Sequence, residues 1–278
     1  MTGLIFSQPN SKAETASSTT FSTPIWSASS ATSEEPLRPL RGLVKRSTHS
    51  SLPTPLACAA EAIADDLLRR ARTRVGESLR VAAKRLGVDV EEHQLDPGVH
   101  GAAIIRFRSI VLSPSGYTAR DEFTLAHELM ELHIPGSWRR DLPKATKEAA
   151  CDRGAAALLL PAAAFKQSVA ELGANLPPLR RRWAHASWST IARRMVDVGA
   201  ATSAASWDCL EQTWRYGPGE TTREEEDALV LACFNGRGSA SAKGIRAWRL
   251  GGEGPGRAVS ISRGNSASAS LSAPRGYA

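Results

Sequence analysis

Apolar residues recur at helical spacing over several segments of the 278-residue chain, with two strand-like runs between them. The first helical segment spans residues 57–86, where Gly76 divides or loosens the helix and Gly87 ends it. The next two apolar runs are "AAIIRF" and "SIVLSP", which are typical of short strands. Their closeness predicts an antiparallel pair, and "PSGY" is the expected turn toward the next helix.

Two longer helices are predicted on either side of a polar loop. The first carries "EFTLAHELMELHI"; it is expected to begin near Asp121 or Thr124, either of which could cap it, and to end before Pro135. The second carries "KEAACDRGAAALLL", with Thr146 as its expected cap and Pro161 as its stop. The alanines of the second helix would allow another helix to pack closely against it.

Weaker patterns follow these two helices. A helix-loop-helix is predicted from "AAFKQSVAEL" and "PLRRRWAHASWSTIARRMVDV". Beyond residue 201 the pattern predicts one helix at "EEEDALVLACF" and two short strands at "IRAWRL" and "AVSIS". Together with the earlier elements, these patterns predict an α+β fold with a small antiparallel sheet packed on helices.

Composition divides the chain into parts. Residues 1–55 are rich in Ser and Thr with scattered apolar positions, so this segment is expected to be disordered, and residues 263–278 likewise. Residues 56–200 form the expected folded domain, and residues 201–262 a C-terminal extension of mixed helix and short strands. No secretory signal or run of about 18 apolar residues is present, which favours a cytoplasmic protein with no membrane partner.

Cysteine and charge add two expectations. The four cysteines show no C-x-x-C spacing, so neither a disulfide framework nor a cysteine zinc site is indicated. The formal net charge of +7 suits an anionic partner, but solvated helix faces and a basic linker are the preferred explanation, since no aromatic-interleaved RNA motif accompanies the charge. Within the basic region, "HASWSTIARRM" is similar to the second half of a helix-turn-helix, with Ser187 or Ser189 as cap and Arg193 and Arg194 exposed. DNA binding through this helix is an open, less favoured interpretation.

The helix over residues 122–134 could hold a metal ion. His127 and Glu131 are four residues apart and therefore project from one face of a helix, where both can reach one ion. Glu128 points about 100° away and stays free to act as a general base. His133 is six residues from His127, about 120° around the axis, so it is an alternative ligand only if the helix unwinds before Pro135.

A third ligand must come from another element, and the following helix offers Glu148 and Asp152, again four residues apart. Both acids also have ordinary explanations. Each could complement the dipole of its helix, and Asp152 could pair with Arg153 or Arg139. A helix rich in Glu and His is also commonly just a solvated face. The order of the segments favours chemistry: a strand pair, then "FTLAHEL", then an acidic helix that ends in "ALLLP".

In that order the sequence resembles the ImmA/IrrE family of zinc-dependent metallo-endopeptidases. Members pair an F-T-x-A-H-E-x-x-H helix with an E-x-x-A-[ND]-x-x-A-x-x-L-L-x-P helix, and the resemblance covers roughly residues 57–200. It implies His127 as the first metal ligand, Glu128 as the catalytic base and Glu148 as the third ligand. Asp152 falls on the Asn/Asp position. Glu131 stands where the family has its second histidine, and there the chain departs from the pattern.

The resemblance implies a zincin-like α+β fold and a metallopeptidase domain over residues 56–200. The implied ligands His127, Glu131 and Glu148 still form a sensible zinc set. Two carboxylates cancel the charge of the ion, so it should be a weaker Lewis acid, and Mn²⁺ or Fe²⁺ become plausible alternatives. Asp152 and His133 are the remaining candidates for a supporting or alternative ligand.

The implied function is a metal-dependent endopeptidase that cleaves a helix-turn-helix transcriptional repressor and so controls a stress-response or mobile-element gene set. A second hypothesis is a peptidase-fold regulator that has lost hydrolysis, marked by Glu131, and binds a partner protein without cleaving it. A third is the basic DNA-binding protein considered above.

Overall fold

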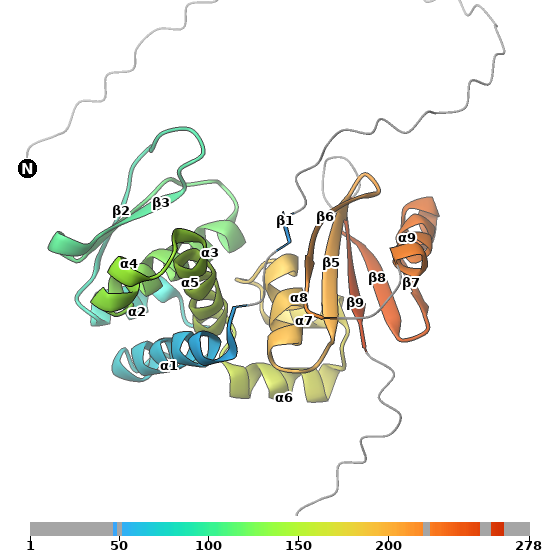
Figure 1. The fold of residues 1–278 in the computed structure, drawn as a ribbon, viewed down its shortest axis with the longest axis horizontal. Coiled ribbons are helices and arrows are strands. Elements are labelled where there is room, and N and C mark those ends of the chain that lie inside the picture. Colours follow the sequence, from blue (N-terminus) through green and yellow to red (C-terminus); the bar gives the residue numbers. More distant parts are fainter. Residues whose placement is uncertain (1–46, 49–51, 219–222, 251–256, 264–278) are drawn as a thin grey trace, which may run out of the picture. The chain divides into compact units, whose positions relative to one another are not determined.

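The computed structural model describes residues 47–48, 52–218, 223–250 and 257–263. The segments expected to be disordered fall almost entirely outside these residues, so those expectations stay predictions. The described chain is of the predicted α+β class and contains two sheets, one of three strands and one of six. Figure 1 shows both sheets with the helices that flank them.

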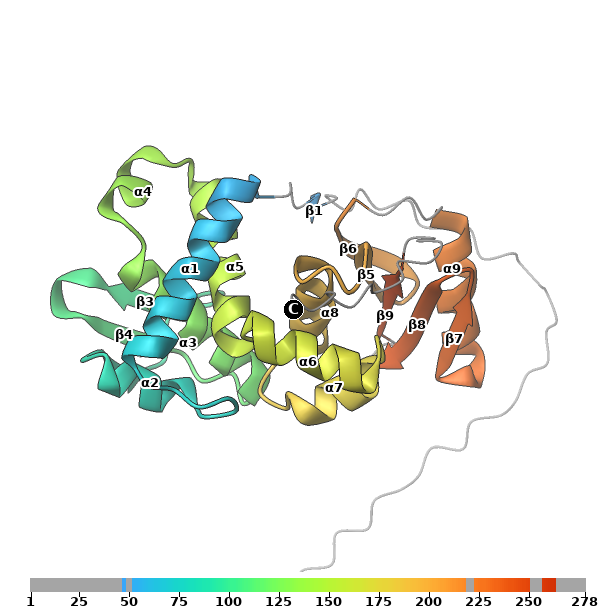
Figure 2. The same cartoon turned by 90° about the horizontal axis from the view of Figure 1, so that it is seen from below.

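The first helical pattern forms two helices, as Gly76 indicated. They are α1 (Thr54–Arg70) and α2 (Leu79–Arg85). Gly76 lies in the link with φ of 83°, a left-handed conformation that favours glycine. The buried residues of α1 lie at helical spacing on one face, Ala60, Ala64 and Leu67. That face packs on the helix α5 described below, and Figure 2 shows the two side by side.

The smaller sheet has the strand order β2-β4-β3, with β2 at Asp89–Glu92, β3 at Gly101–Ile104 and β4 at Ser109–Leu112. β3 and β4 are antiparallel, as predicted from their closeness, while β2 joins β4 in parallel. Because Gly101 has no side chain, strand β3 can lie directly against helix α3 (Thr118–His133). A Cβ atom on Gly101 would stand 2.6 Å from Cγ2 of Thr124, so any larger residue would push the strand away.

The two helices expected to carry the chemistry are α3 (Thr118–His133) and α5 (Lys144–Leu159), joined by the short helix α4 (Gly136–Asp141). Both predicted ends, before Pro135 and before Pro161, are confirmed. Both predicted caps are wrong: α3 begins earlier, and Asp121 instead accepts hydrogen bonds from the N–H (3.1 Å) and hydroxyl (2.6 Å) of Ser115.

The start of α5 also lies before its predicted cap, Thr146. Pro143 precedes the first residue of α5, Lys144, and proline is compatible with a helix start. The expected close packing of α5 is confirmed at Gly154, where a Cβ atom would stand 2.2 Å from Cε of Met130 on α3. The absence of a side chain at Gly154 therefore lets α3 and α5 approach closely.

Three helices follow α5: α6 (Ala162–Leu172), α7 (Leu176–Arg182) and α8 (Trp188–Asp197). Ser187 caps α8 as predicted, since its hydroxyl accepts a hydrogen bond from the N–H of Thr190 at 3.1 Å. The expectation that Arg193 and Arg194 are exposed is wrong. Arg194 is fully buried and donates to the carbonyl of Leu160, because α8 lies between α5 and the larger sheet.

The larger sheet has the strand order β1-β6-β5-β9-β8-β7. Its helix α9 (Arg223–Ala232) and two of its strands, β8 (Ile245–Leu250) and β9 (Arg257–Ser262), confirm the weak patterns beyond residue 201. The other strands escaped prediction, and a short π-helical turn follows α9. They are β1 (Ser47–Thr48), β5 (Ser203–Asp208), β6 (Glu211–Tyr216) and β7 (Ser239–Ala242), with the turn at Cys233–Arg237.

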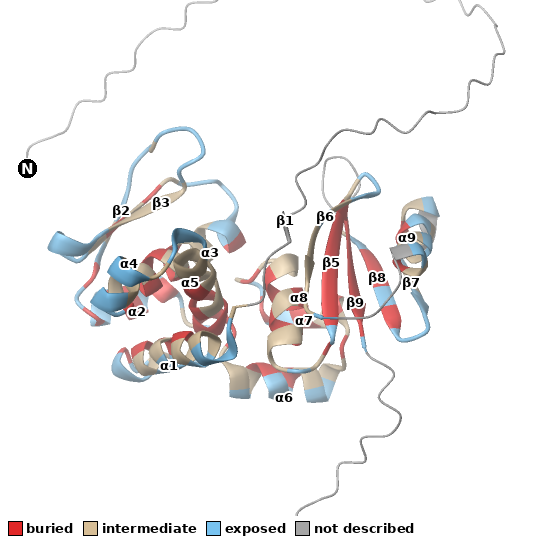
Figure 3. Ribbon diagram, viewed as in Figure 1, coloured by how far each residue is buried: buried red, intermediate tan, exposed pale blue. Residues whose placement is uncertain are grey.

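Strand β5 was missed because both of its faces are covered. β5 is buried at every residue from Ser203 to Trp207, so its sequence "SAASWD" shows no alternation of apolar and polar positions. Helix α8 contacts β5 and β9, while α9 contacts β7, β8 and β9. Figures 1 and 3 show α8 and α9 on opposite sides of the sheet, with β5 and β9 buried between them. Within the described part of the chain, no helix is both long and apolar enough to span a membrane.

Candidate functional site

His127 on α3 reaches two acids on α5. Its Nδ1 lies 2.9 Å from Oδ1 of Asp152, and its Nε2 lies 3.3 Å from Oε2 of Glu148. The imidazole is largely buried, with 16% of its side chain exposed. Burial alone would lower the pKa of His127, but the hydrogen bond and charge of Asp152, together with Glu128 and Glu148, leave that pKa raised. The helix pair therefore sets one histidine between two carboxylates.

The contact between His127 and Glu148 favours a proton or a metal ion between the two side chains. When the Nδ1–H of His127 donates to Asp152, the neutral ring turns the lone pair of Nε2 toward the oxygen of Glu148. Two lone pairs 3.3 Å apart repel each other unless a proton or a metal ion lies between them. The raised pKa of His127 means that the acids around the ring stabilise its protonated form, in which a proton lies between Nε2 and Glu148.

Glu128 lies on the side of α3 that faces β3. It is buried, with 8% of its surface exposed, and a Cβ atom on Gly101 would stand 3.2 Å from its Oε1. Burial raises the pKa of Glu128, and the nearby carboxylates of Glu131 and Glu148 act in the same direction, against His127 and the backbone N–H of Ala103. Glu128 is thus a fixed, partly desolvated carboxyl group beside His127.

Glu131 is bound by a lysine that the sequence patterns did not single out. Nζ of Lys147 donates to Oε1 of Glu131 at 2.9 Å, and both side chains are mostly covered. The hydrogen bond from Lys147 to Glu131 raises the pKa of the lysine. Lys147 directly precedes Glu148, the third expected ligand, on α5. The charge of Glu131, which stands at the family's second-histidine position, is therefore neutralised by a residue of α5.

His133, the alternative ligand, has a different environment. Its Nδ1–H donates to the carbonyl of Leu129 at 2.8 Å, and burial lowers its pKa. No interaction found among the described residues joins it to His127, Glu148 or Asp152. His133 therefore lies in the packed face of α3, as helical geometry indicated.

The expected ligands fit the metal of the resembled family only in part. Across the described ranges, no group of three or more His, Cys, Asp or Glu side chains is arranged to hold a metal ion. Two expected ligands nevertheless stand at a suitable spacing, because ligand atoms on one tetrahedral zinc with bonds of about 2.1 Å are roughly 3.4 Å apart. The contact of Asp152 with Nδ1 is also the kind that orients a ligating histidine. His127 and Glu148 fit a metal, while Glu131 is held by Lys147.

Cys151 plays no part in nucleophilic chemistry. It is fully buried between the acids of α5, and burial raises the pKa of its thiol to about 12. A thiol with that pKa stays protonated at neutral pH. Cys58, Cys209 and Cys233 are also free, the first two exposed and the third buried.

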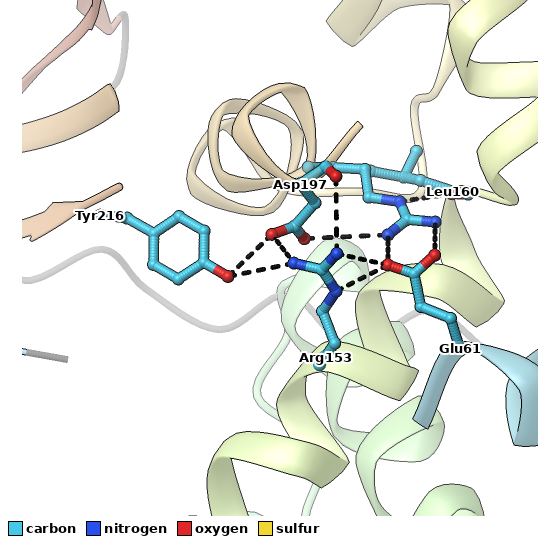
Figure 4. Close-up of polar contacts among 6 residues, drawn as sticks. Glu61, Arg153, Leu160, Asp197 and Tyr216 are labelled. Carbon is cyan, nitrogen blue, oxygen red and sulfur yellow. Dashed lines mark hydrogen bonds and ion pairs between the residues drawn. The ribbon is translucent and has the colours of Figure 1, made fainter. Parts of the chain in front are cut away.

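The surface pairs considered as an alternative for Asp152 do not form, since Arg139 donates to the carbonyls of Glu131 and Leu132, and Arg153 pairs with Glu61 and Asp197. Arg153 belongs to a buried ion cluster, which comprises Glu61 of α1, Arg153 of α5, Arg194 and Asp197 of α8, and Tyr216 of β6 (Figure 4). Glu61 stands 2.6 Å from the guanidinium of Arg153 and 2.7 Å from that of Arg194.

The ion cluster ties the helices to the larger sheet. The hydroxyl of Tyr216 on β6 donates to Asp197 at 2.7 Å, and Asp197 also pairs with Arg153. Because Arg153 follows Asp152 in the chain, the cluster anchors α5 at the turn that orients His127. Its members are far apart in sequence, so no local pattern could have revealed the cluster.

Helices α3 and α5 thus bring His127 of α3 against Glu148 and Asp152 of α5, with the buried Glu128 next to His127 in the chain. Residues 83–194 match the family model described as the IrrE N-terminal-like domain (Peptidase_M78). The resemblance to the ImmA/IrrE family seen in the two sequence blocks is thus confirmed over residues 83–194.

One solved structure with a related fold is that of a Mycobacterium tuberculosis transcriptional regulator. It is 14% identical in sequence with a TM-score of 0.56, and the match covers 75% of this chain and 76% of that chain. At this identity the likeness concerns the fold alone. The search of curated proteins finds no match.

Proposed function

We propose that this protein is a metal-dependent endopeptidase whose ion is held by His127 and Glu148, with Glu131 as a third ligand that also binds Lys147. The observation that carries the proposal is the contact of His127 with two acids: Asp152 fixes the ring at Nδ1, and Nε2 faces Glu148 at 3.3 Å. Zinc is the metal expected from the family, and Mn²⁺ or Fe²⁺ would suit the oxygen-rich set.

The residues of the chain divide the work of peptide hydrolysis. A bound zinc ion would supply Lewis acidity toward the scissile carbonyl and the attacking water. Glu128 takes the proton from that water and passes it to the leaving amine. Its position between α3 and β3 keeps the carboxylate beside the reacting groups. Since β3 is an edge of the smaller sheet, an extended substrate segment can pair with it.

The proposed substrate is a helix-turn-helix repressor encoded near this protein, cleaved in the cytoplasm. Incubation of both purified proteins with zinc is expected to give discrete repressor fragments, separated by gel electrophoresis and assigned by mass spectrometry. A chelator should abolish the fragments, because His127 and Glu148 cannot polarise a carbonyl without the ion. An intact repressor under all metal conditions would contradict the proposal.

Removal of Lys147 is expected to strengthen metal binding. Lys147→Met frees Glu131 from its ion pair and takes a positive charge away from the proposed ion, while the length of the side chain is kept. Since the pair is partly covered, the gain should be about 1 kcal/mol, roughly fivefold in affinity. Zinc titration against a chromophoric chelator measures it, with Lys144→Met at the start of α5 as the matched control. An unchanged affinity would exclude Glu131 from the metal site.

A second candidate function is a regulator that binds its partner without cleaving it. The ion pair of Glu131 with Lys147 favours it, since this pair satisfies the carboxylate without a metal. The regulator hypothesis predicts a stable complex with the neighbouring repressor and no fragments. The DNA-binding hypothesis loses its basis, because Arg194 is buried and Arg193 is partly covered.

A further inference from the structure

A cavity of about 1050 Å³ lies between the helices that carry the site and the larger sheet. Its walls come from α3, α5 and α8 on one side and from β5 and β6 on the other. Aromatic rings supply much of the lining, among them Phe123, Trp188 and Trp214. A volume of this size with aromatic walls is typical of a site for a small organic molecule.

The charged groups of the cavity do not balance one another. Four arginines and three aspartates line it, and every aspartate already has a partner. Asp152 holds His127, Asp197 belongs to the ion cluster, and Asp208 stands 3.8 Å from Arg257. Of the arginines, Arg153 also belongs to the ion cluster, and Arg120 donates to the ring of His100 at 2.8 Å.

Arg193, the remaining arginine, has the most unusual position. Its guanidinium stacks on the ring of Trp214 at 4.5 Å, which holds the planar group in place. Its Nε is shielded from solvent and has no hydrogen-bond partner among the residues that the structure describes, nor does the guanidinium form an ion pair with any of them. Burial lowers the pKa of Arg193, and the charges of Asp152, Tyr216 and Asp197 offset that effect only in part.

An arginine that is stacked and half-buried with unused donors is suited to an anion that offers two oxygen atoms. Its fork of N–H groups matches the two oxygens of a carboxylate or phosphate, and desolvation strengthens such a pair. Nothing else in the described lining supplies an acceptor to Arg193. Trp188 and Trp214 offer ring surface in the same cavity.

We propose that this cavity binds a small organic anion with a planar ring, whose carboxylate or phosphate pairs with Arg193 while the ring packs against Trp188 and Trp214. The ligand is distinct from a peptide substrate at His127 and does not depend on metal or on hydrolysis. Because Asp152 and Arg153 form part of the same wall, the ligand would lie beside the residue that orients His127.

Two fluorescent probes of nearly equal shape test the proposal on the full-length protein. 8-Anilino-1-naphthalenesulfonate carries an anion, and N-phenyl-1-naphthylamine has the same rings without it. We expect the anionic probe to bind at least about tenfold more tightly, since a charge-assisted hydrogen bond is formed only with the sulfonate. Equal affinity for the two probes would overturn the assignment of an anion site.

Variants of residues in the cavity test whether the probe binds there. Arg193→Met should weaken the anionic probe about tenfold or more and leave the neutral probe within about twofold. Arg193→Lys should give an intermediate loss, because lysine keeps the charge without the stacked, forked donors. Arg181→Met, an exposed arginine on α7, is the matched control. If the Arg193 variants fold, as judged by thermal melting, and bind the anionic probe like the wild type, the proposal is wrong.

A variant at a second residue tests the site even if the Arg193 variants do not fold. Trp214→Leu removes the stacking surface and should weaken both probes, whereas unchanged binding of both would contradict the site. Displacement of the anionic probe then assigns the head group. Indole-3-acetate represents the carboxylates and adenosine monophosphate the phosphates, and displacement by either supports the site. If neither compound displaces the probe, the cavity does not bind a planar ring with an anionic head group, and the proposal fails.

Discussion

Glutamine in place of Glu128 is expected to lower the rate of repressor cleavage about 1000-fold, the effect of losing a positioned general base. The glutamine side chain has nearly the same volume, so it can occupy the same buried space between α3 and β3. Its amide cannot accept the proton of the attacking water. The rate should therefore fall without loss of fold, metal or partner binding.

The measurement is a cleavage time course with the neighbouring repressor, accompanied by zinc titration and pull-down of the partner. Glu122→Gln makes the same chemical change on the same helix at a residue that hydrogen-bonds Ser78, and it should keep nearly full activity. A Glu128→Gln variant that cleaves at the wild-type rate would remove Glu128 from the mechanism. If the wild-type protein binds the repressor but never cleaves it, the result would instead support the non-catalytic regulator.

Alanine in place of Glu61 is expected to cost about 3 kcal/mol of stability, because it leaves buried charge in the ion cluster without its main partner. Arg194 is fully buried, and Glu61 supplies its nearest carboxylate oxygen, at 2.7 Å; the other acid, Asp197, lies 3.8 Å away. Burial would raise the pKa of Glu61, but Arg194 and Arg153 outweigh it and leave that pKa lowered, as expected for a carboxylate that its partners stabilise.

For a folded unit of roughly 200 residues this loss corresponds to a melting temperature lower by about 6–12 °C. Circular dichroism during heating measures it. Glu171→Ala, which removes an exposed ion pair with Arg182 on the surface, should shift the melting temperature by no more than about 2 °C. Equal shifts for the two variants would show that the ion cluster contributes no more than a surface pair.

Much of the fold followed from local rules in the sequence. The prolines at 135 and 161 end α3 and α5 because proline restricts the residue before it. Helical periodicity brought His127 and Glu131 to one face, and the "FTLAHEL" block identified the family. Strand β5 could not be predicted, since its burial on both faces erases the alternation that marks a half-exposed strand.

Local sequence rules reach only a few residues along the chain, so they determined the helix ends, the paired strands, the His127–Glu128 motif and the family. The tertiary structure alone decided which charges meet. It joined Lys147 to Glu131, and it buried Arg194 against Glu61, 133 residues away. It also stacked Arg193 on Trp214, with no ion-pair partner among the residues that the structure describes. Such pairs depend on how helices and sheets pack, because two side chains interact strongly only when the fold places them within a few ångströms of each other.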